Sequence, residues 1–537
     1  MKLENQLRLK KETLMNMTKV LRFLAICAVS VAFATIASAQ VNTSIHSSGA
    51  IATSPNGGPV TLAGGVARVG SFASPSLILG PRAIPSATAA TTAATGPNYS
   101  LFSCQVTGEM PAGESCYDPY QIRHAYNIDT LINAGFDGKG KTIVIIDAFQ
   151  SPNIVLELNT YIAFYGLPSL NGLGGASNSS LGTFTQIAPN GLTPFDPTNQ
   201  DQVGWAEEIT LDVLWAHAIA PGANIKLVLS KSDADADIQS AREYVVANHL
   251  GDVISQSFGE NESCMDPSLV EQQHQSFAKA TVNNTTIFAS TGDNGAGQPT
   301  CDGLSLVQAA SSPATDPLVT AVGGTELHAA GYCFTVLGCN PATSPLPGTF
   351  QGEVAWNESS IGATGGGFSV LYDEPSYQKG TIHGGKQRGV PDVSYNAAVL
   401  HGVLTYLNIP GIPAGFYLFG GTSAGSPQWS AILAIADQKA GSDLGFINKA
   451  LYHIGQAPPH YSASFFDVMS GNNSFAGVTG FNAGKGWDPT TGLGSPTTDQ
   501  LVSYLMQFVS PGDGTSAIAQ SAHMKGNPSA PGQQKPH

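Results

Sequence analysis

Apolar segments of strand length alternate with segments of helical periodicity through the middle of this chain, and this alternation limits the fold more than any other feature. The strand-like segments cover residues 141–147, 224–230, 252–258 and 285–290. The helix-like segments cover residues 205–217, 234–248 and 267–282. Apolar strands separated by helices predict an α/β fold with a mostly parallel central sheet and helices on both faces. Ligand sites in such folds gather at the carboxyl ends of the strands.

The size and composition of the chain fit one large domain with flanking segments, or two domains. The sequence has 537 residues, of which 42% are hydrophobic, enough to bury a large core. Only 11% are charged, well below the roughly 25% usual in globular domains. We expect the folded protein to be a monomer.

Residues 1–39 predict a signal peptide. A basic stretch precedes an apolar run over residues 23–36, and residues 37–39 (ASA) match a signal peptidase site. The run is too short to span a bilayer comfortably, which favours cleavage over an uncleaved anchor. The remaining chain carries 17 Lys and Arg against 36 Asp and Glu, a net charge of −19. We therefore expect a secreted protein, extracellular or periplasmic, with no stable membrane anchor and no affinity for nucleic acid.

The cysteine count fits an oxidising compartment. Of seven cysteines, Cys27 lies in the signal peptide, so an even number of six remains for disulfide bonds. Six cysteines allow fifteen pairings. Proximity in the sequence suggests the pairs Cys104–Cys116, Cys264–Cys301 and Cys333–Cys339.

The two ends of the chain differ from its centre. Residues 40–115 are rich in Ser, Ala, Thr, Gly and Pro and show only weak strand-like pieces, at 51–53 and 60–69. We interpret them as a low-complexity N-terminal segment or a short propeptide. Residues 509–537 are polar and rich in Gly and Pro, which predicts a disordered tail. The folded domain is therefore expected at 116–508.

Ser423 follows a strand-like run and two glycines, and it opens a helical stretch in the sequence GGTSAGSP. A serine at such a strand-to-helix turn can present its hydroxyl at the edge of the sheet, and backbone N–H groups there can face a developing oxyanion. The alternative is a serine that only caps a helix.

A nucleophilic serine needs a base, and the residues around Glu208 offer a better one than any histidine. None of the twelve histidines lies in a segment of the His-Gly-Thr-His type, and His217 lies in an apolar run typical of a structural histidine. Glu208 and Asp212 are four positions apart, so on a helix their side chains lie about 40° apart on one face. Glu207 is about 140° from Asp212 and points elsewhere. Two solvated acids near a helix N-terminus remain the alternative.

Asp293 follows the strand-like segment 285–290 in the sequence STGDNG, which predicts a position at the carboxyl edge of the sheet. An ordinary Asx-turn residue is the alternative interpretation.

The chain as a whole resembles the sedolisin (serine-carboxyl peptidase) family over about residues 116–505. The resemblance rests on the order and joint occurrence of motifs at 208–222 (EITLDVLWAHAIAPG), 254–259 (ISQSFG), 290–295 (STGDNG), 321–325 (AVGGT), 365–369 (GGGFS), 375–378 (PSYQ), 390–395 (VPDVSY) and 421–427 (GTSAGSP). It implies a subtilisin-like fold and a secreted endopeptidase that acts at acidic pH.

The resemblance also implies a role for each site residue. Ser423 would be the nucleophile, Glu208 the general base and then acid, and Asp212 would orient and tune Glu208. Asp293 would donate a hydrogen bond in the oxyanion hole. These roles suit acidic conditions, because a carboxyl base has an unperturbed pKa of about 4.3 and Asp293 can donate only while it is protonated.

The C-terminal part resembles the calcium loop of the same family, in the segments FFDVMSG and GKGWDPTTGLGSP. The implied cofactor is Ca²⁺, which takes six to eight oxygen ligands. The implied ligands are the carboxylates of Asp467 and Asp488 and the backbone carbonyls of Val468, Gly484 and Gly486.

The sequence departs from the family in one respect, and it leaves other activities open. Relatives usually carry a large folded propeptide, whereas residues 40–115 are too few for one. One alternative function is a tripeptidyl aminopeptidase on the same fold. A second is a catalytically silent, calcium-stabilised surface protein, and a neutral Ser-His-Asp protease is disfavoured because its histidine segment is absent. Protein or peptide substrates are the expected partners.

Overall fold

The computed structural model describes residues 46–47, 72–88, 99–110, 113–175, 177–382, 386–510 and 512–521. These residues belong to one unit, Ile45–His537. The signal peptide expected at 1–39, including Cys27, and the strand-like pieces expected at 51–53 and 60–69 lie outside the described residues.

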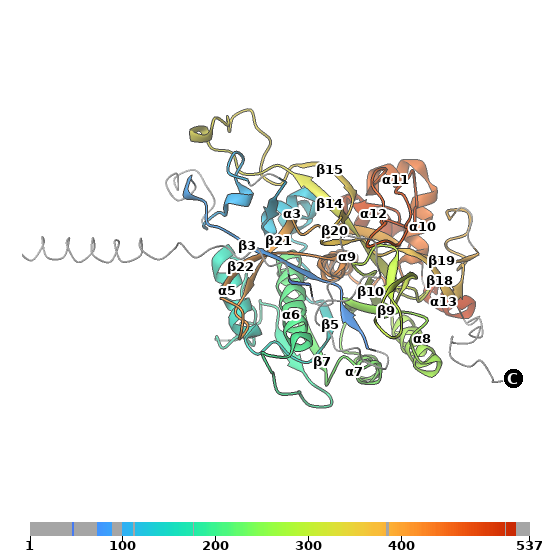
Figure 1. Cartoon of the computed structure of the whole chain (residues 1–537). Helices are drawn as coiled ribbons and strands as arrows, with labels where there is room; N and C mark the ends of the chain where they lie inside the picture. The colour runs from blue at the N-terminus through green and yellow to red at the C-terminus, as the bar shows by residue number, and fades with distance from the viewer. Residues whose placement is uncertain are drawn as a thin grey trace, which may run out of the picture. The chain divides into compact units, whose positions relative to one another are not determined.

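An eight-stranded sheet organises the described residues (Figure 1). Its order is β15 (Phe350–Ala355), β14 (Thr320–Ala329), β10 (Thr286–Ser290), β8 (Val253–Gln256), β5 (Thr142–Ala148), β7 (Asn224–Ser230) and β6 (Phe184–Ile187), with β20 (Val393–Asn396) paired to β14. Every pairing in this sheet is parallel except that of β14 with β15. The mostly parallel sheet predicted from the alternating pattern is therefore confirmed.

Two pairs of helices cover the sheet. Helices α6 (Gln200–Ile219) and α9 (Gly425–Ala440) contact each other and strand β5. Helices α7 (Asp235–Ala247) and α8 (Pro267–Val282) also contact each other. On the other face of the sheet, α7 packs on β7 and α8 packs on β10 (Figure 1). The predicted α/β layers are thus present. The helix predicted at 267–282 coincides with α8, whereas those predicted at 205–217 and 234–248 differ from α6 and α7 by a few residues at their ends.

A second sheet lies beyond α6 and explains why that helix is buried nearly all round. Its order is β1 (His46–Ser47), β3 (Ile78–Arg82), β22 (Gly415–Gly420), β21 (His401–Leu407) and β4 (Ser115–Tyr117). Helix α6 contacts β21 of this sheet as well as β5 of the first. Its start is fixed by Asn199, whose side chain accepts hydrogen bonds from the N–H groups of Asp201 and Gln202.

The remaining elements form small sheets and peripheral helices. The helices are α3 (Pro119–Ala125), α4 (Ile128–Asn133), α5 (Ile154–Tyr165), α10 (Asn448–Gln456), α11 (Pro458–Ser464), α12 (Thr498–Phe508) and α13 (Asp513–Ser521). The 3₁₀ turns are η1 (Ser103–Gln105), η2 (Thr335–Leu337) and η3 (Thr422–Ala424). The short strands are β2 (Ser74–Pro75), β9 (Phe258–Asn261), β11 (Gly297–Pro299), β12 (Leu306–Gln308), β13 (Ser311–Ser312), β16 (Asn357–Glu358), β17 (Gly362–Ala363), β18 (Gly367–Asp373), β19 (Gln387–Val390), β23 (Phe465–Phe466) and β24 (Ser495–Pro496).

Both ends of the folded part hold more structure than the sequence suggests. Within the segment 40–115, strands β2 and β3 pair with the distant strands β9 and β22. Within the tail expected at 509–537, α13 is helical, and Asp513 forms an ion pair with Lys449 at 2.5 Å. The tail after residue 521 lies outside the described residues.

The three suggested disulfide bonds, Cys104–Cys116, Cys264–Cys301 and Cys333–Cys339, are all formed. Among the described residues, none of the helices is long and apolar enough to cross a membrane.

Candidate active site

Ser423 lies in the turn η3, between the end of β22 and the start of α9, and its side chain is fully buried. The preceding Gly421 makes the turn possible, because its φ of 98° is a conformation that residues with a side chain rarely adopt. A Cβ atom at this position would lie 2.4 Å from Asp293 Oδ2 and 2.5 Å from the carbonyl oxygen of Ser76. Glycine therefore allows three segments to meet beside the serine.

The hydroxyl of Ser423 faces a carboxyl group. Its Oγ donates to Glu208 Oε2 at 2.9 Å and also lies 3.0 Å from the carbonyl oxygen of Ser257. Glu208 and Asp212 are one helical turn apart on α6, and both are fully buried. The structure thus brings Ser423, Glu208 and Asp212 into one buried site.

Burial and mutual repulsion hold protons on these acids. Burial, followed by the charges of Asp212 and Asp147, raises the pKa of Glu208 well above its ordinary value. Burial raises the pKa of Asp212 to about 8. Glu208 Oε1 and both carboxyl oxygens of Asp212 have no hydrogen-bond partner among the described residues. Carboxyl groups so close together share protons, since they cannot all ionise.

Asp147 is a third acid of this cluster, and the sequence interpretation missed it. It lies at the carboxyl end of β5, fully buried, and its two carboxyl oxygens have no partner within the described chain. Burial and then the charge of Asp212 raise its pKa well above the ordinary value. The available signal was an acid at the carboxyl end of an apolar strand, where sites of parallel sheets gather.

Asp293 lies on the other side of the serine turn. Its Oδ1 accepts from the N–H of Thr422 at 2.8 Å and from the Thr422 hydroxyl at 2.9 Å. Its Oδ2 is buried and has no partner among the residues that the structure describes. Burial raises the pKa of Asp293 to about 8, so in acid this carboxyl carries a proton that Oδ2 can donate.

No histidine among the described residues takes part in this arrangement. Nε2 of His217 is 2.8 Å from the carbonyl oxygen of Pro168, and burial lowers the pKa of His217 to about 4. This is the structural histidine that the sequence indicated. Across the described ranges, no histidine is hydrogen-bonded to Ser423.

A strand from the N-terminal segment covers the serine. The N–H of Ser76 donates to the carbonyl oxygen of Ser257 at 3.1 Å, and its own carbonyl oxygen accepts from the N–H of Ser423 at 2.9 Å. Before it, β2 runs antiparallel to β9, and the N–H of Ala73 donates to the carbonyl oxygen of Asp233. After it, β3 runs antiparallel to β22. The backbone of residues 72–82 thus lies across the site in an extended form that is hydrogen-bonded to its neighbours at β2, at Ser76 and at β3.

The residues expected to bind calcium lie together in a loop cluster. Asp467 accepts from the N–H of Gly486 at 3.0 Å, and Asp488 accepts from the N–H of Gly484 at 3.0 Å. Burial raises the pKa of Asp488 to about 6. The carbonyl oxygens of Val468, Gly484 and Gly486 accept no hydrogen bond within the described residues. Two carboxylates and three free carbonyls form a donor set that fits the oxygen chemistry of Ca²⁺.

Comparisons with known proteins agree with this geometry. The chain is 30% identical over 414 residues to kumamolisin of Bacillus sp. (strain MN-32), a match that covers 74% of this chain and 65% of kumamolisin. It is 29% identical over 381 residues to sedolisin of Pseudomonas sp. (strain 101), covering 68% of this chain and 57% of sedolisin. It is also 28% identical over 329 residues to tripeptidyl-peptidase 1 of Rattus norvegicus, covering 56% and 52%.

The fold gives the same result. A solved structure of Pseudomonas sedolisin, described as a serine-carboxyl proteinase, superposes with a TM-score of 0.59 at 27% identity, over 74% of this chain and all of that one. No protein-family model matches. The described fold is subtilisin-like, with a serine and buried carboxyl groups at its centre. The chain belongs to the sedolisin family, and it spans less than two thirds of the length of the curated relatives named above.

Proposed function

We propose that this chain is a secreted serine-carboxyl endopeptidase that hydrolyses peptide bonds in acid. The observation that carries the proposal is the 2.9 Å contact from Ser423 Oγ to Glu208 Oε2, in a buried site without a histidine partner among the described residues. Secretion is supported by the disulfide bonds and by the signal sequence expected at residues 1–39.

Each acid has a defined task in this mechanism. Glu208 takes the proton of Ser423 as Oγ attacks the carbonyl carbon of the substrate, and it later gives that proton to the leaving amine. Asp212 orients Glu208 and shares its proton. The oxyanion is stabilised by the N–H of Ser423 and by the proton on Asp293 Oδ2, and one such donor typically contributes a factor of about 10²–10³ in rate. Water then hydrolyses the acyl-enzyme by the same steps in reverse.

We further propose that residues 40–115 include a short propeptide whose strand at 72–82 is bound like a substrate. The Ser76 carbonyl oxygen accepts from the proposed oxyanion donor, the N–H of Ser423, and β2 and β3 extend the strand on either side. Hydrolysis of the Ser76–Leu77 bond would add one water, leave a carboxylate on Ser76 and a free amine on Leu77, and open the site.

This strand also favours an endopeptidase over a tripeptidyl aminopeptidase. Residues 72–76 occupy five positions on the amino side of the Ser76 carbonyl, and Phe72 still forms a bridge with Ala234. A groove built to release tripeptides would end after three residues. A catalytically silent surface protein is disfavoured, because all four proposed catalytic groups lie around one turn.

Calcium is proposed as a structural ion at the loop of Asp467 and Asp488. The carbonyls of Val468, Gly484 and Gly486 would complete the protein's share of the oxygen ligands, with water filling the rest. Bound calcium would fix the loop and hold the Asp488 carboxylate ionised despite its burial.

The experiment that tests the proposed function is hydrolysis of an unfolded, N-terminally blocked protein near pH 4. We expect internal cleavage by the full chain and none by Ser423→Ala. Unchanged cleavage by that variant would overturn the proposal, and release of tripeptides only from an unblocked substrate would favour the aminopeptidase. N-terminal sequencing of the incubated full chain should reveal a new terminus at Leu77, absent from Ser423→Ala.

A further inference from the structure

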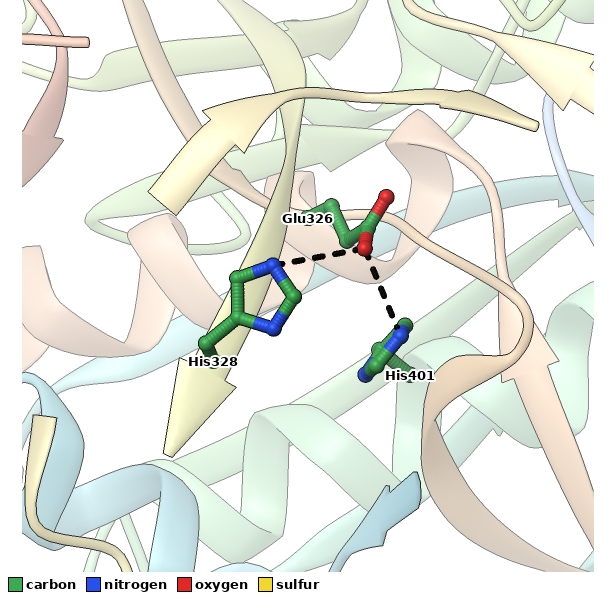
Figure 2. A group of neighbouring side chains, drawn as sticks. All are labelled: Glu326, His328 and His401. Carbon is green, nitrogen blue, oxygen red and sulfur yellow. Dashed lines mark ion pairs between the residues drawn. The ribbon is translucent and has the colours of Figure 1, made fainter. Parts of the chain in front are cut away.

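A second group of chemically active side chains lies away from the serine site. It consists of Glu326, His328 and His401, called here the His-Glu cluster (Figure 2). Glu326 and His328 are two residues apart on β14 and therefore project from the same face of that strand, while Leu327 between them is buried. His401 is the first residue of β21, in the other sheet. The cluster thus joins two rigid elements from distant parts of the sequence.

Two of the three separations between the donor atoms of the His-Glu cluster have the length expected of metal ligands, and all three atoms lie within 4.8 Å of one another. Nε2 of His328 and Nε2 of His401 lie 3.4 and 3.3 Å from the same oxygen, Glu326 Oε1 (Figure 2). A normal N–H···O hydrogen bond is about 2.9 Å long. Ligands held tetrahedrally about 2.0–2.1 Å from a zinc ion are about 3.4 Å apart. The separations therefore match the edges of a coordination tetrahedron better than they match hydrogen bonds.

A chain of hydrogen bonds sets the tautomer of His401. The hydroxyl of Tyr117 donates to the carbonyl oxygen of Leu327 at 2.7 Å, so it accepts the hydroxyl proton of Ser115, which is 3.2 Å away. Ser115 Oγ must then accept from Nδ1–H of His401, at 2.7 Å. The proton of the neutral ring is fixed on Nδ1, and the lone pair of Nε2 points into the cluster. Metal-binding histidines are oriented in this way by a partner on their other nitrogen.

The His-Glu cluster is accessible, and nearby groups do not compete for its ligand atoms. The His328 side chain is 44% exposed. Its partner on the neighbouring strand β15 is Gly352, and a Cβ atom added there would meet nothing within 4 Å, so the space beside His328 is open. The nearby carboxylate of Glu358 is already engaged, because its oxygens accept from the N–H groups of Val399 and Leu400.

We propose that the His-Glu cluster binds a divalent transition-metal ion, with Zn²⁺ as its best occupant. Two imidazoles and one carboxylate suit zinc, whereas Ca²⁺ and Mg²⁺ prefer oxygen ligands. The ion links β14 of the eight-stranded sheet to β21 of the five-stranded sheet, and its fourth ligand is water. This site is separate from the calcium loop and from the proposed peptidase chemistry.

Titration calorimetry of the full chain with zinc at pH 7 tests this proposal. The protein should carry Ser423→Ala to prevent self-digestion, and calcium should be saturating so that zinc does not enter the calcium loop. We expect one zinc per chain and a zinc-dependent rise in the unfolding temperature. His328→Ala and His401→Ala should each weaken binding by more than the roughly 10- to 100-fold expected for Ser115→Ala, which acts through His401.

The matched control is His124→Ala. His124 forms a comparable imidazole–carboxylate pair with Asp129, at 2.8 Å, and the structure describes no second imidazole within metal-ligand distance of that pair. This variant should bind zinc like its parent. Absence of zinc binding by the parent, or equal zinc affinity in the folded His328→Ala variant, would overturn the proposal. The unfolding temperature measured without zinc shows whether each variant is folded.

Discussion

Buried carboxyl groups in two parts of this protein differ in how many hydrogen-bond donors surround them. Asp392 is fully buried and paired with the equally buried Arg388, whose Nη1 and Nη2 donate to its two oxygens at 2.6 and 2.5 Å. Tyr452 and the N–H of Ala321 donate to the same carboxylate. Glu208 and Asp212 are buried as deeply, yet most of their oxygens have no partner among the described residues. The Asp392 carboxylate is satisfied and holds the structure together, whereas the carboxyl groups of Glu208 and Asp212 remain free to exchange protons.

This difference gives the two kinds of carboxyl group different roles, one structural and one in proton transfer. Removal of a donor from a buried carboxylate that has several of them is strongly destabilising. Carboxyl groups without donors retain protons to unusually high pH, and this makes them useful acids and bases. Both kinds lie within motifs that resemble the sedolisin family, Asp392 in VPDVSY and Glu208 in EITLD, so the sequence alone does not separate the two roles.

The largest expected effect comes from breaking the satisfied group. Arg388→Met would leave the Asp392 charge buried without its partner, and loss of one member of a buried pair costs about 3–5 kcal/mol of the free energy of unfolding. Denaturant titration measures this change. Lys141→Met is the control, because the Lys141–Asp443 pair is partly exposed and should contribute about 0–1 kcal/mol. Equal losses in both variants would contradict the contrast.

A second effect should appear at the oxyanion. Asp293→Ala removes the proposed donor, and we expect kcat to fall about 10²–10³-fold near pH 4. Asp293→Asn keeps an N–H donor that does not titrate, so it should retain more activity than Asp293→Ala and lose the part of the activity decline at high pH that ionisation of Asp293 causes. An Asn variant as inactive as the Ala variant, with an unchanged pH profile, would show that Asp293 does not act as a donor.

A gradual effect is expected in the pH dependence of stability. Burial raises the pKa values of Asp212, Asp293 and Asp437 to about 8, whereas unfolded aspartates titrate near 3.9. Between these values the native state binds more protons than the unfolded state, so the free energy of unfolding falls as pH rises, by up to about 1.4 kcal/mol per pH unit for each group. Denaturant titration of Ser423→Ala at pH 4, 6 and 8 with saturating calcium measures it. Rising stability over this range would contradict the raised pKa values.

The same reasoning links the covering strand to acid activity. Burial is the largest cause of the raised pKa values of Glu208, Asp212 and Asp293. Departure of residues 72–82 would admit water to the site and lower those values. The mature enzyme should therefore lose activity at a lower pH than the pKa values in the covered form suggest.

Local patterns predicted much of this site. The spacing of Glu208 and Asp212 alone indicated one helix face, and the strand before Asp293 indicated the sheet edge, where this residue lies. The roles of these residues came from the family resemblance rather than from spacing. Asp147 was missed because an acid at the end of a strand is common, and the sequence does not say which other acids lie beside it.

Contacts between distant segments could not be predicted in this way. Strands β2 and β3 form only because residues 74–82 pair with strands far away in the sequence, and Ser76 has no local feature that marks it. His401 likewise meets Glu326 and His328 only through the packing of two sheets. Periodicity reports how a segment folds, but it does not report which segments become neighbours.

The most direct test of a glutamate base compares Glu208→Gln with Glu207→Gln, in kcat/KM on one peptide substrate near pH 4. Both residues are buried on α6. Ser423 Oγ is hydrogen-bonded to Glu208 and to the carbonyl oxygen of Ser257 rather than to Glu207, so a neutral amide at position 207 should change little. We expect a loss of at least about 10⁴-fold in Glu208→Gln and near-parental activity in Glu207→Gln. Retained activity in a folded Glu208→Gln variant would contradict deprotonation of Ser423 by this carboxyl group.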